Sequence, residues 1–291
     1  MKKILSIMLA AVMMISAAAC GTTGDSDSKS STADSRTETT VSSSAPEDSS
    51  AGDSDESTGS AVDAIKESGK LVMLTNATFP PYEYFKGNEI QGIDAELAKL
   101  IADELGVELE IVDMNFDLLI DAVNSGKGNI VAAGMSITDE RKKAVDFSIP
   151  YIDTQLVVIV KEGSDIKSFA DFDGKKISVQ ESTTSDLYLS DTEDVAPSEI
   201  MRFKSAVEAG NALSVGKSDG VLMDKPTAEN VVAANEGMVI LTGETVSEEQ
   251  YAMAVPKGQE DFLAVVDEVL QKAVDEGQVD EFIAYHMKNY K

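Results

Sequence analysis

The 291-residue sequence contains one cysteine, one histidine and no tryptophan. Because the single cysteine is Cys20, the rest of the chain can form neither a disulfide nor a thiolate metal site. The single histidine, His286, lies in the last expected helix, where we expect a surface position, and imidazole-based catalysis is nearly excluded. We therefore expect no metal ion, no cofactor and no enzymatic activity.

Basic residues are also scarce. The chain has 24 Lys and Arg against 52 Asp and Glu, a formal net charge of −28. A surface of this sign repels phosphate backbones, so nucleic acid is not an expected partner.

The first twenty residues have the pattern of a targeting segment. Two lysines precede an apolar run at 4–15, and small residues at 17–19 suit a cleavage site. The run is too short to span a membrane as a helix. Cys20 at its end resembles a bacterial lipobox, although Ala17 replaces the usual leucine. We expect a lipid-anchored protein on the outer face of the cell membrane; the alternative is ordinary secretion with an incidental Cys20.

Residues 21–60 have the composition of a flexible tether. Twenty of these forty residues are Ser or Thr, nine are acidic, and Val41 is the only large aliphatic. Such a segment buries too little apolar surface to offset its ordering entropy. The folded part is therefore expected from residue 61 onward.

Apolar runs and helical periodicity alternate along this folded part, which predicts an α/β protein. Strands are expected at 71–75, 109–112, 130–133, 156–160, 177–179, 201–203, 221–223, 239–241 and 251–255. Helices are expected at 94–105, 118–123, 184–189, 206–215, from Pro226 onward, and at 261–276 and 279–287.

The order of these elements predicts two lobes. Residues 61–154 and 252–291 are expected to form lobe 1, and residues 155–251 lobe 2. Two crossing strands, near 153–156 and 250–252, would join them as hinges. The arrangement places a cleft between the lobes, where the carboxyl ends of the strands favour ligand binding.

The stretch GMSITDER, at 134–141, follows an expected strand of lobe 1. Thr138 is a suitable N-cap for a helix whose first turn would present Arg141. A guanidinium beside hydroxyls and free backbone N–H groups is suited to a carboxylate. Asp224 ends a strand of lobe 2, so the pair would suit a zwitterion. The alternative is a solvated helix end with an ordinary surface arginine.

Four motifs occur together in this order, at 76–84, 92–97, 134–151 and 220–226. With the lipoprotein-like start they resemble the extracellular solute-binding proteins of bacterial ABC importers, specifically the polar-amino-acid family. The resemblance covers about residues 66–291. It implies a two-lobed periplasmic-binding-protein fold of type 2, a small-molecule amino-acid ligand and a permease in the membrane as partner.

The resemblance also implies roles for single residues. Arg141 matches the arginine that binds the ligand α-carboxylate, and Gly134 and Ser136 match backbone and hydroxyl contacts around the same groups. Asp224 matches the carboxylate that binds the α-ammonium. Asp224 also precedes Pro226, so it could instead be a helix N-cap, or be both.

Further matches lie on both lobes. Phe79 and Phe116 match aromatics that sandwich the ligand side chain, although either could be an ordinary core aromatic. Thr183 and Thr184 lie on the lobe 2 loop that supplies more carboxylate contacts. Many members have Gly-Thr-Gly there, whereas this chain begins the turn with Ser182.

The sequence leaves the ligand open. Asn76, Gln180 and Met223 are expected around the ligand side chain, with Glu181 or Glu83 as further candidates. Our order is arginine or another basic amino acid, then glutamine, then cystine. Two other functions stay open: a dehydratase on the same fold, with Glu181 as general acid, and a ligand-sensing surface lipoprotein without transport.

Overall fold

The computed structural model describes residues 59–243 and 245–290. The expectations for the targeting segment, for Cys20 and for most of the tether lie outside these residues. Ser60, the last residue of the expected tether, caps the first helix, because its hydroxyl accepts a 3.1 Å hydrogen bond from the Asp63 N–H. In the described part, no helix combines the length and apolarity needed to span a bilayer.

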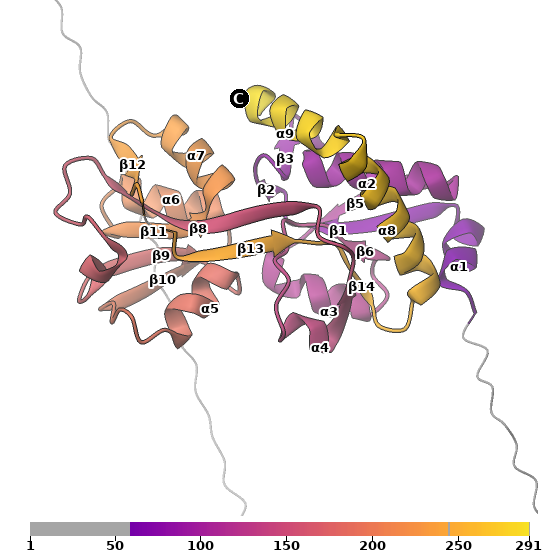
Figure 1. Ribbon diagram of the computed structural model, residues 1–291, viewed down its shortest axis with the longest axis horizontal. Coiled ribbons are helices and arrows are strands. Elements are labelled where there is room, and N and C mark those ends of the chain that lie inside the picture. Colours follow the sequence, from indigo (N-terminus) through magenta and orange to yellow (C-terminus); the bar gives the residue numbers. More distant parts are fainter. Residues whose placement is uncertain (1–58, 244, 291) are drawn as a thin grey trace, which may run out of the picture. The chain divides into compact units, whose positions relative to one another are not determined.

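Lobe 1 is built on a five-stranded sheet in the order β5-β1-β6-β14-β7 (Figure 1). The first three strands are parallel, and β14 runs antiparallel to β6 and β7. The strands are β1 (Lys70–Thr75), β5 (Glu108–Asp113), β6 (Ile130–Val131), β7 (Val145–Phe147) and β14 (Ala254–Pro256). The helices of this part are α1 (Ala61–Ser68), α2 (Ile93–Leu105), η1 (Phe116–Leu118), α3 (Leu119–Asn124), α4 (Arg141–Ala144), α8 (Glu260–Asp275) and α9 (Gln278–Asn289).

Lobe 2 is built on a second sheet in the order β10-β9-β11-β8-β12, with β13 paired to β8. Its strands are β8 (Ile152–Lys161), β9 (Lys176–Gln180), β10 (Glu199–Phe203), β11 (Gly220–Asp224), β12 (Met238–Ile240) and β13 (Ser247–Tyr251). Its helices are η2 (Phe169–Phe172), α5 (Thr184–Asp191), α6 (Ala206–Ser214) and α7 (Lys225–Ala234).

Two antiparallel strands connect the sheets. The first half of β8 pairs with β13, from Ile152 opposite Tyr251 to Leu156 opposite Ser247, and its second half pairs with β11 and β12. Figure 1 shows β8 and β13 running side by side between the two groups of elements. The predicted fold class, a two-lobed α/β protein with two crossing hinge strands, is confirmed.

The expected strand at 251–255 is instead two strands. β13 ends at Tyr251 and β14 begins at Ala254. Between them the chain passes from one sheet to the other, and its N–H groups leave the ladder: Ala252 donates to the Met135 carbonyl and Met253 to the Ser148 hydroxyl.

A small antiparallel sheet carries the 76–84 motif. It contains β2 (Thr78–Phe79), β3 (Glu83–Lys86) and β4 (Glu89–Gln91), and it leads directly into α2. The main-chain N–H groups of Ile93 and Asp94 donate to the carbonyls of Pro81 and Tyr82. The first two motifs of the sequence are therefore one connected unit.

The expectation of a surface position for His286 is wrong. Its side chain is 1% exposed, because it lies against Tyr84 of β3 and Glu96 of α2. The Tyr84 hydroxyl lies 2.9 Å from His286 Nδ1, and burial lowers the pKa of the imidazole while the nearby Glu96 raises it. His286 fixes the C-terminal helix and lies outside the candidate site.

Candidate functional site

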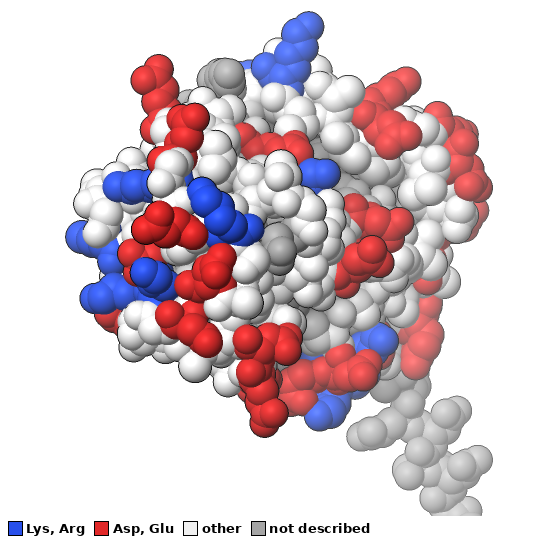
Figure 2. Space-filling view, turned by 60° about the vertical axis from the view of Figure 1, so that its left-hand side comes forward, with Lys and Arg blue, Asp and Glu red and all other residues white. Residues whose placement is uncertain are grey.

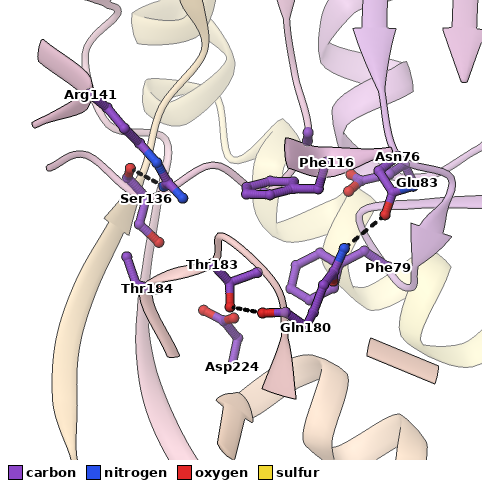
Figure 3. Close-up of a pocket in the computed structure, with 12 residues that line it drawn as sticks. Asn76, Phe79, Glu83, Phe116, Ser136, Arg141, Gln180, Thr183, Thr184 and Asp224 are labelled. Atoms are coloured by element: carbon purple, nitrogen blue, oxygen red, sulfur yellow. Dashed lines mark hydrogen bonds between the residues drawn. The ribbon is translucent and has the colours of Figure 1, made fainter. Parts of the chain in front are cut away.

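One pocket brings together ten of the residues that the sequence nominated (Figure 3). Its walls lie close together and leave a cavity of about 20 Å³, which is room for about one water molecule. Its lining is Asn76, Phe79, Glu83, Phe116, Ala133, Gly134, Ser136, Arg141, Gln180, Thr183, Thr184 and Asp224. Residues of both lobes contribute, so the pocket is the predicted interlobe cleft. Of the remaining side-chain candidates, Glu83 lines it, whereas Glu181 and Met223 do not.

Arg141 is buried, which excludes the alternative of a surface arginine. The expected helix is a single turn that begins at Arg141, with Glu140 and not Thr138 at its N-cap position. The Thr138 hydroxyl still accepts a 3.1 Å hydrogen bond from the Arg141 N–H. The guanidinium donates to the carbonyl of Ser136 at 2.7 Å and, across the cleft, to the carbonyl of Ser182 at 3.1 Å. Burial lowers the pKa of Arg141 to about 10, opposed by the negative charge of Glu249. The group remains cationic at neutral pH.

Gly134 has a backbone conformation that requires glycine. Its φ is +53°, and a Cβ would lie 2.6 Å from Cε1 of Phe79. The backbone therefore passes against the aromatic wall of the pocket. The Gly134 N–H donates to the Asp94 carboxylate at 2.8 Å, and the Tyr151 hydroxyl donates to the same carboxylate at 2.8 Å. Asp94 thus holds the start of the GMSITDER segment in place.

Asp224 lies on the lobe 2 wall, at the end of β11. It occupies the N-cap position of α7, but its side chain makes no capping hydrogen bond, and Oδ1 has no hydrogen-bond partner among the described residues. Burial raises its pKa to about 7, helped by the charge of Glu249 and opposed by the Tyr251 hydroxyl and by Arg141. A buried carboxyl with a free oxygen is an acceptor ready for a cationic group.

The two predicted aromatic residues lie in different surroundings. Phe79 stacks on Tyr82 with 5.4 Å between ring centroids, and Tyr251 meets both rings edge-on. Phe116 is half-buried, and its ring lies beneath the Arg141 guanidinium (Figure 3). Phe79 is thus both a core aromatic and a pocket wall.

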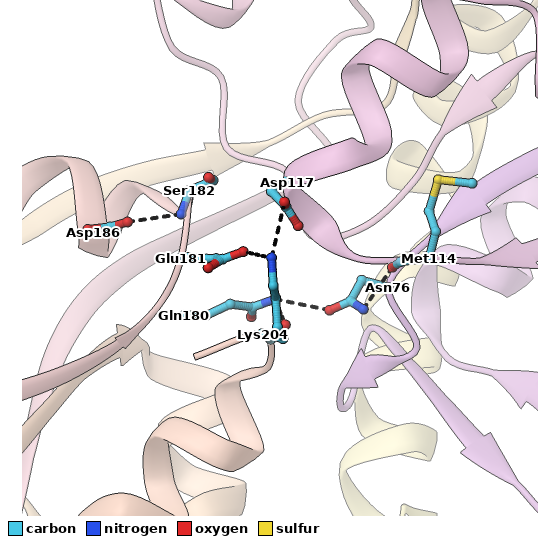
Figure 4. A network of polar contacts seen from close by, with 8 residues as sticks. All are labelled: Asn76, Met114, Asp117, Gln180, Glu181, Ser182, Asp186 and Lys204. Atoms are coloured by element: carbon cyan, nitrogen blue, oxygen red, sulfur yellow. Dashed lines mark hydrogen bonds and ion pairs between the residues drawn. The ribbon is translucent and has the colours of Figure 1, made fainter. Parts of the chain in front are cut away.

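A polar network joins the lobes at the other end of the pocket (Figure 4). Asn76 donates to the Met114 carbonyl at 2.9 Å and accepts from Gln180 of lobe 2 at 3.0 Å. Lys204 of lobe 2 contacts Asp117 of lobe 1 at 3.2 Å and also pairs with Glu181. These direct contacts make the structure a closed form.

Glu83 lies at this same end, beside Asn76 (Figure 3). It is 0% exposed, and neither carboxyl oxygen has a hydrogen-bond partner in the described chain. Burial raises its pKa well above the ordinary value, and the charge of Asp94 adds to the effect. Glu83 is therefore a buried acid of the pocket wall.

The lobe 2 loop departs from the glycine-containing turn of many family members. Ser182 adopts the left-handed conformation, with φ of +61°, where glycine is favoured. Its N–H donates to Asp186 at 3.0 Å, and Thr183 is the N-cap of α5.

Sequence reasoning missed two residues behind the pocket wall. Asp94 stood inside a quoted motif and could have been found as a buried acid in an otherwise apolar helix start. Glu249 gave no signal, because the sequence holds 52 acids. Its carboxylate accepts hydrogen bonds from Ser136 of lobe 1 and Thr184 of lobe 2.

On the face that Figure 2 shows, acidic side chains lie among and around the basic ones, so the basic side chains form no continuous band there.

A two-lobed fold with an arginine on one wall of the cleft and a carboxyl on the other defines a solute-binding protein. Residues 71–289 match the bacterial extracellular solute-binding proteins, family 3, and the chain belongs to that family.

Three similar proteins illustrate its range. The arginine-bound form of a truncated ArgBP from T. maritima is 41% identical, covers 72% of this chain and 99% of its own, and has a TM-score of 0.68. A probable histidine-binding protein of Campylobacter jejuni is 31% identical over 81% of this chain and 91% of its own. An ancestral amino-acid-binding protein, described as a precursor of cyclohexadienyl dehydratase, is 32% identical over 78% of this chain and 100% of its own, with a TM-score of 0.72.

Proposed function

We propose that this protein captures a basic amino acid, with arginine favoured, and delivers it to an ABC permease in the membrane. Residues 61–154 and 252–291 would move as one lobe and residues 155–251 as the other. A lipid on Cys20 would hold the protein at the outer face of the membrane, with residues 21–60 as tether.

The α-groups of the ligand are assigned to opposite walls. Arg141 is a buried cation whose donors reach two carbonyls at the cleft, so a ligand carboxylate offers it a better, charged acceptor. Asp224 has a free buried oxygen suited to the ammonium. Because the two lie on different lobes, a bound zwitterion contacts both only when the lobes are closed, and it therefore favours closure.

Glu83 is the residue that favours a ligand with a basic side chain. A buried carboxyl without partners is costly, and a guanidinium in the same pocket would supply both the charge and two parallel donors. Asn76 and Gln180 would complete the contact from either lobe. Glutamine, the second choice, would use these two amides and leave Glu83 unpaired. Cystine, the third choice, would place an apolar disulfide beside Glu83.

Calorimetric titration of the protein with the twenty amino acids tests this proposal. We expect arginine to bind most tightly and Arg141→Ala to lose more than about a hundredfold in affinity, because a charged hydrogen-bonded partner is removed. Glu83→Gln should bring arginine and glutamine closer in affinity. Tight binding of no amino acid, or equal binding by Arg141→Ala, would refute the proposal.

An enzymatic role is the weaker alternative. The proposed general acid, Glu181, does not line the pocket and is paired with Lys204. Turnover of prephenate or arogenate by the purified protein would revive it. A sensing role without transport would be favoured if the neighbouring genes encoded no permease and no ATPase.

A further inference from the structure

Glu249 joins three parts of the molecule that meet at the α-end of the pocket. It lies on hinge strand β13, opposite Thr154 of β8. One oxygen, Oε2, accepts the hydroxyl of Ser136, in the lobe 1 binding segment, and at 2.8 Å the hydroxyl of Thr184, the first residue of α5 in lobe 2. A single carboxylate oxygen thus bridges both walls.

The backbone explains why Glu249 stands there. The Ile137 N–H donates to the Gln250 carbonyl at 3.0 Å, and the Ala252 N–H donates to the Met135 carbonyl at 3.1 Å. Ser136 forms a β-bridge with Tyr251. The binding segment of lobe 1 therefore runs alongside the hinge, and we expect Glu249 to stay beside Ser136 when the lobes separate. Of the two hydrogen bonds that Glu249 accepts, the one from Thr184 would then be broken on opening.

These bonds also fix which way the hydroxyls face. Each hydroxyl has a single proton, and both protons are donated to Glu249. The oxygens of Ser136 and Thr184 therefore offer only lone pairs to the pocket that they line. Lone pairs attract an ammonium group and repel a carboxylate. This orientation differs from the carboxylate contacts expected for these residues from the family resemblance.

We propose that Glu249 is a positioning residue, which turns the Ser136 and Thr184 hydroxyls into acceptors for the ligand α-ammonium and couples them to closure of the lobes. The assignment rests on the proposed amino-acid capture. The negative charge of Glu249 also opposes the effect of burial on the pKa of Arg141 and so favours the cationic form of the guanidinium. Other charged groups near it are Glu248 on its own strand and Asp153 on β8.

The test compares three ligands on the full-length protein: arginine, agmatine, which keeps the amine and lacks the carboxylate, and the desamino analogue of arginine, which keeps the carboxylate. For Glu249→Ala we expect about tenfold weaker binding of arginine and agmatine, the effect of one charge-assisted hydrogen bond, and equal or tighter binding of the desamino analogue. Glu249→Gln, which keeps an acceptor, should restore part of the loss. Glu248→Ala, the exposed neighbour, is the matched control and should change nothing.

Equal losses of affinity for all three ligands would mean that Glu249 has only a structural role. Unchanged affinities for all three would mean that Glu249 has no role in binding. Small-angle scattering without ligand tests the closure part separately. Glu249→Ala should show a larger radius of gyration than wild type and Glu248→Ala, and an unchanged radius would overturn that part. If wild type binds none of the twenty amino acids, the proposed capture is refuted. The scattering result would still show whether Glu249 holds the two lobes together.

Discussion

The guanidinium carbon of Arg141 lies 5.3 Å from the centroid of the Phe116 ring. The two side chains come from α4 and η1 of the same lobe, so their contact does not depend on closure. A cation over an aromatic face is stabilised by the ring quadrupole. Phe116 therefore orients the arginine before a ligand arrives, and it leaves the donors of Arg141 directed at the cleft.

Replacing Phe116 with leucine tests this preorganisation. Leucine keeps the apolar surface but lacks the ring face, so we expect the dissociation constant for arginine to rise about three- to tenfold, which corresponds to roughly 1 kcal/mol of cation–π stabilisation. Isothermal calorimetry measures it. Phe85→Leu is the control, because Phe85 is 51% exposed on β3 and should leave affinity unchanged. Equal affinities for wild type and Phe116→Leu would contradict the role.

Replacing Asp224 with asparagine should make the ligand-free protein more stable and at the same time weaken ligand binding. The folded-state pKa of Asp224 is raised to about 7, mainly by burial. A group of this kind favours folding below its unfolded pKa, near 4, and loses that contribution as pH rises through about 7. We therefore expect Asp224→Asn to stabilise the ligand-free protein by roughly 2 kcal/mol more at pH 8 than at pH 5. The same variant should bind arginine at least about tenfold more weakly.

Urea unfolding at the two pH values measures the stability difference. Glu229→Gln, which removes an exposed acid of α7, is the matched control for the loss of a carboxylate. A stabilisation by Asp224→Asn that is the same at both pH values would show that the Asp224 carboxyl does not ionise across this range.

The residues that line the site could be predicted from the sequence better than the contacts that hold these residues in place. Arg141, Gly134 and Asp224 follow strand ends, and strand ends are fixed by hydrophobic periodicity, so their meeting could be predicted. Glu249 could not be found, because its position depends on hinge pairing in the third dimension. The His286 expectation failed for a similar reason: only the docking of α9 on β3 and α2 buries it.

Ser182→Gly should stabilise the protein. Ser182 holds a φ of +61°, and this left-handed conformation costs about 1–2 kcal/mol for a residue with a side chain. The gain is partly offset, because glycine also has more freedom in the unfolded chain. We expect a net increase of about 0.5–1 kcal/mol in the free energy of unfolding. Ser182→Ala keeps the strained Cβ and should show no gain, so equal stabilisation by both variants would contradict strain as the cause.

Lys204 and Asp117 close the outer edge of the cleft, and their contact tests how far ligand-independent bonds favour the closed form. Nζ of Lys204 lies 3.2 Å from Asp117 Oδ2 of the other lobe, and about half of the lysine side chain is exposed. An exposed ion pair contributes about 0.2–1 kcal/mol and is weakened by salt. Lys204→Met should therefore weaken arginine capture by about two- to threefold at low salt and less at high salt.

A double-mutant cycle separates this interlobe pair from the contact that Lys204 makes with Glu181 in its own lobe. Combining Lys204→Met with Asp117→Asn should lose less affinity than the sum of the single losses, by about 0.5 kcal/mol. Lys217→Met is the control, because it removes an exposed lysine of lobe 2 away from the cleft. Fully additive losses would mean that Lys204 does not act through Asp117. Closure would then depend on the other interlobe contacts, among them Asn76 with Gln180, Arg141 with Ser182 and the bridge at Glu249.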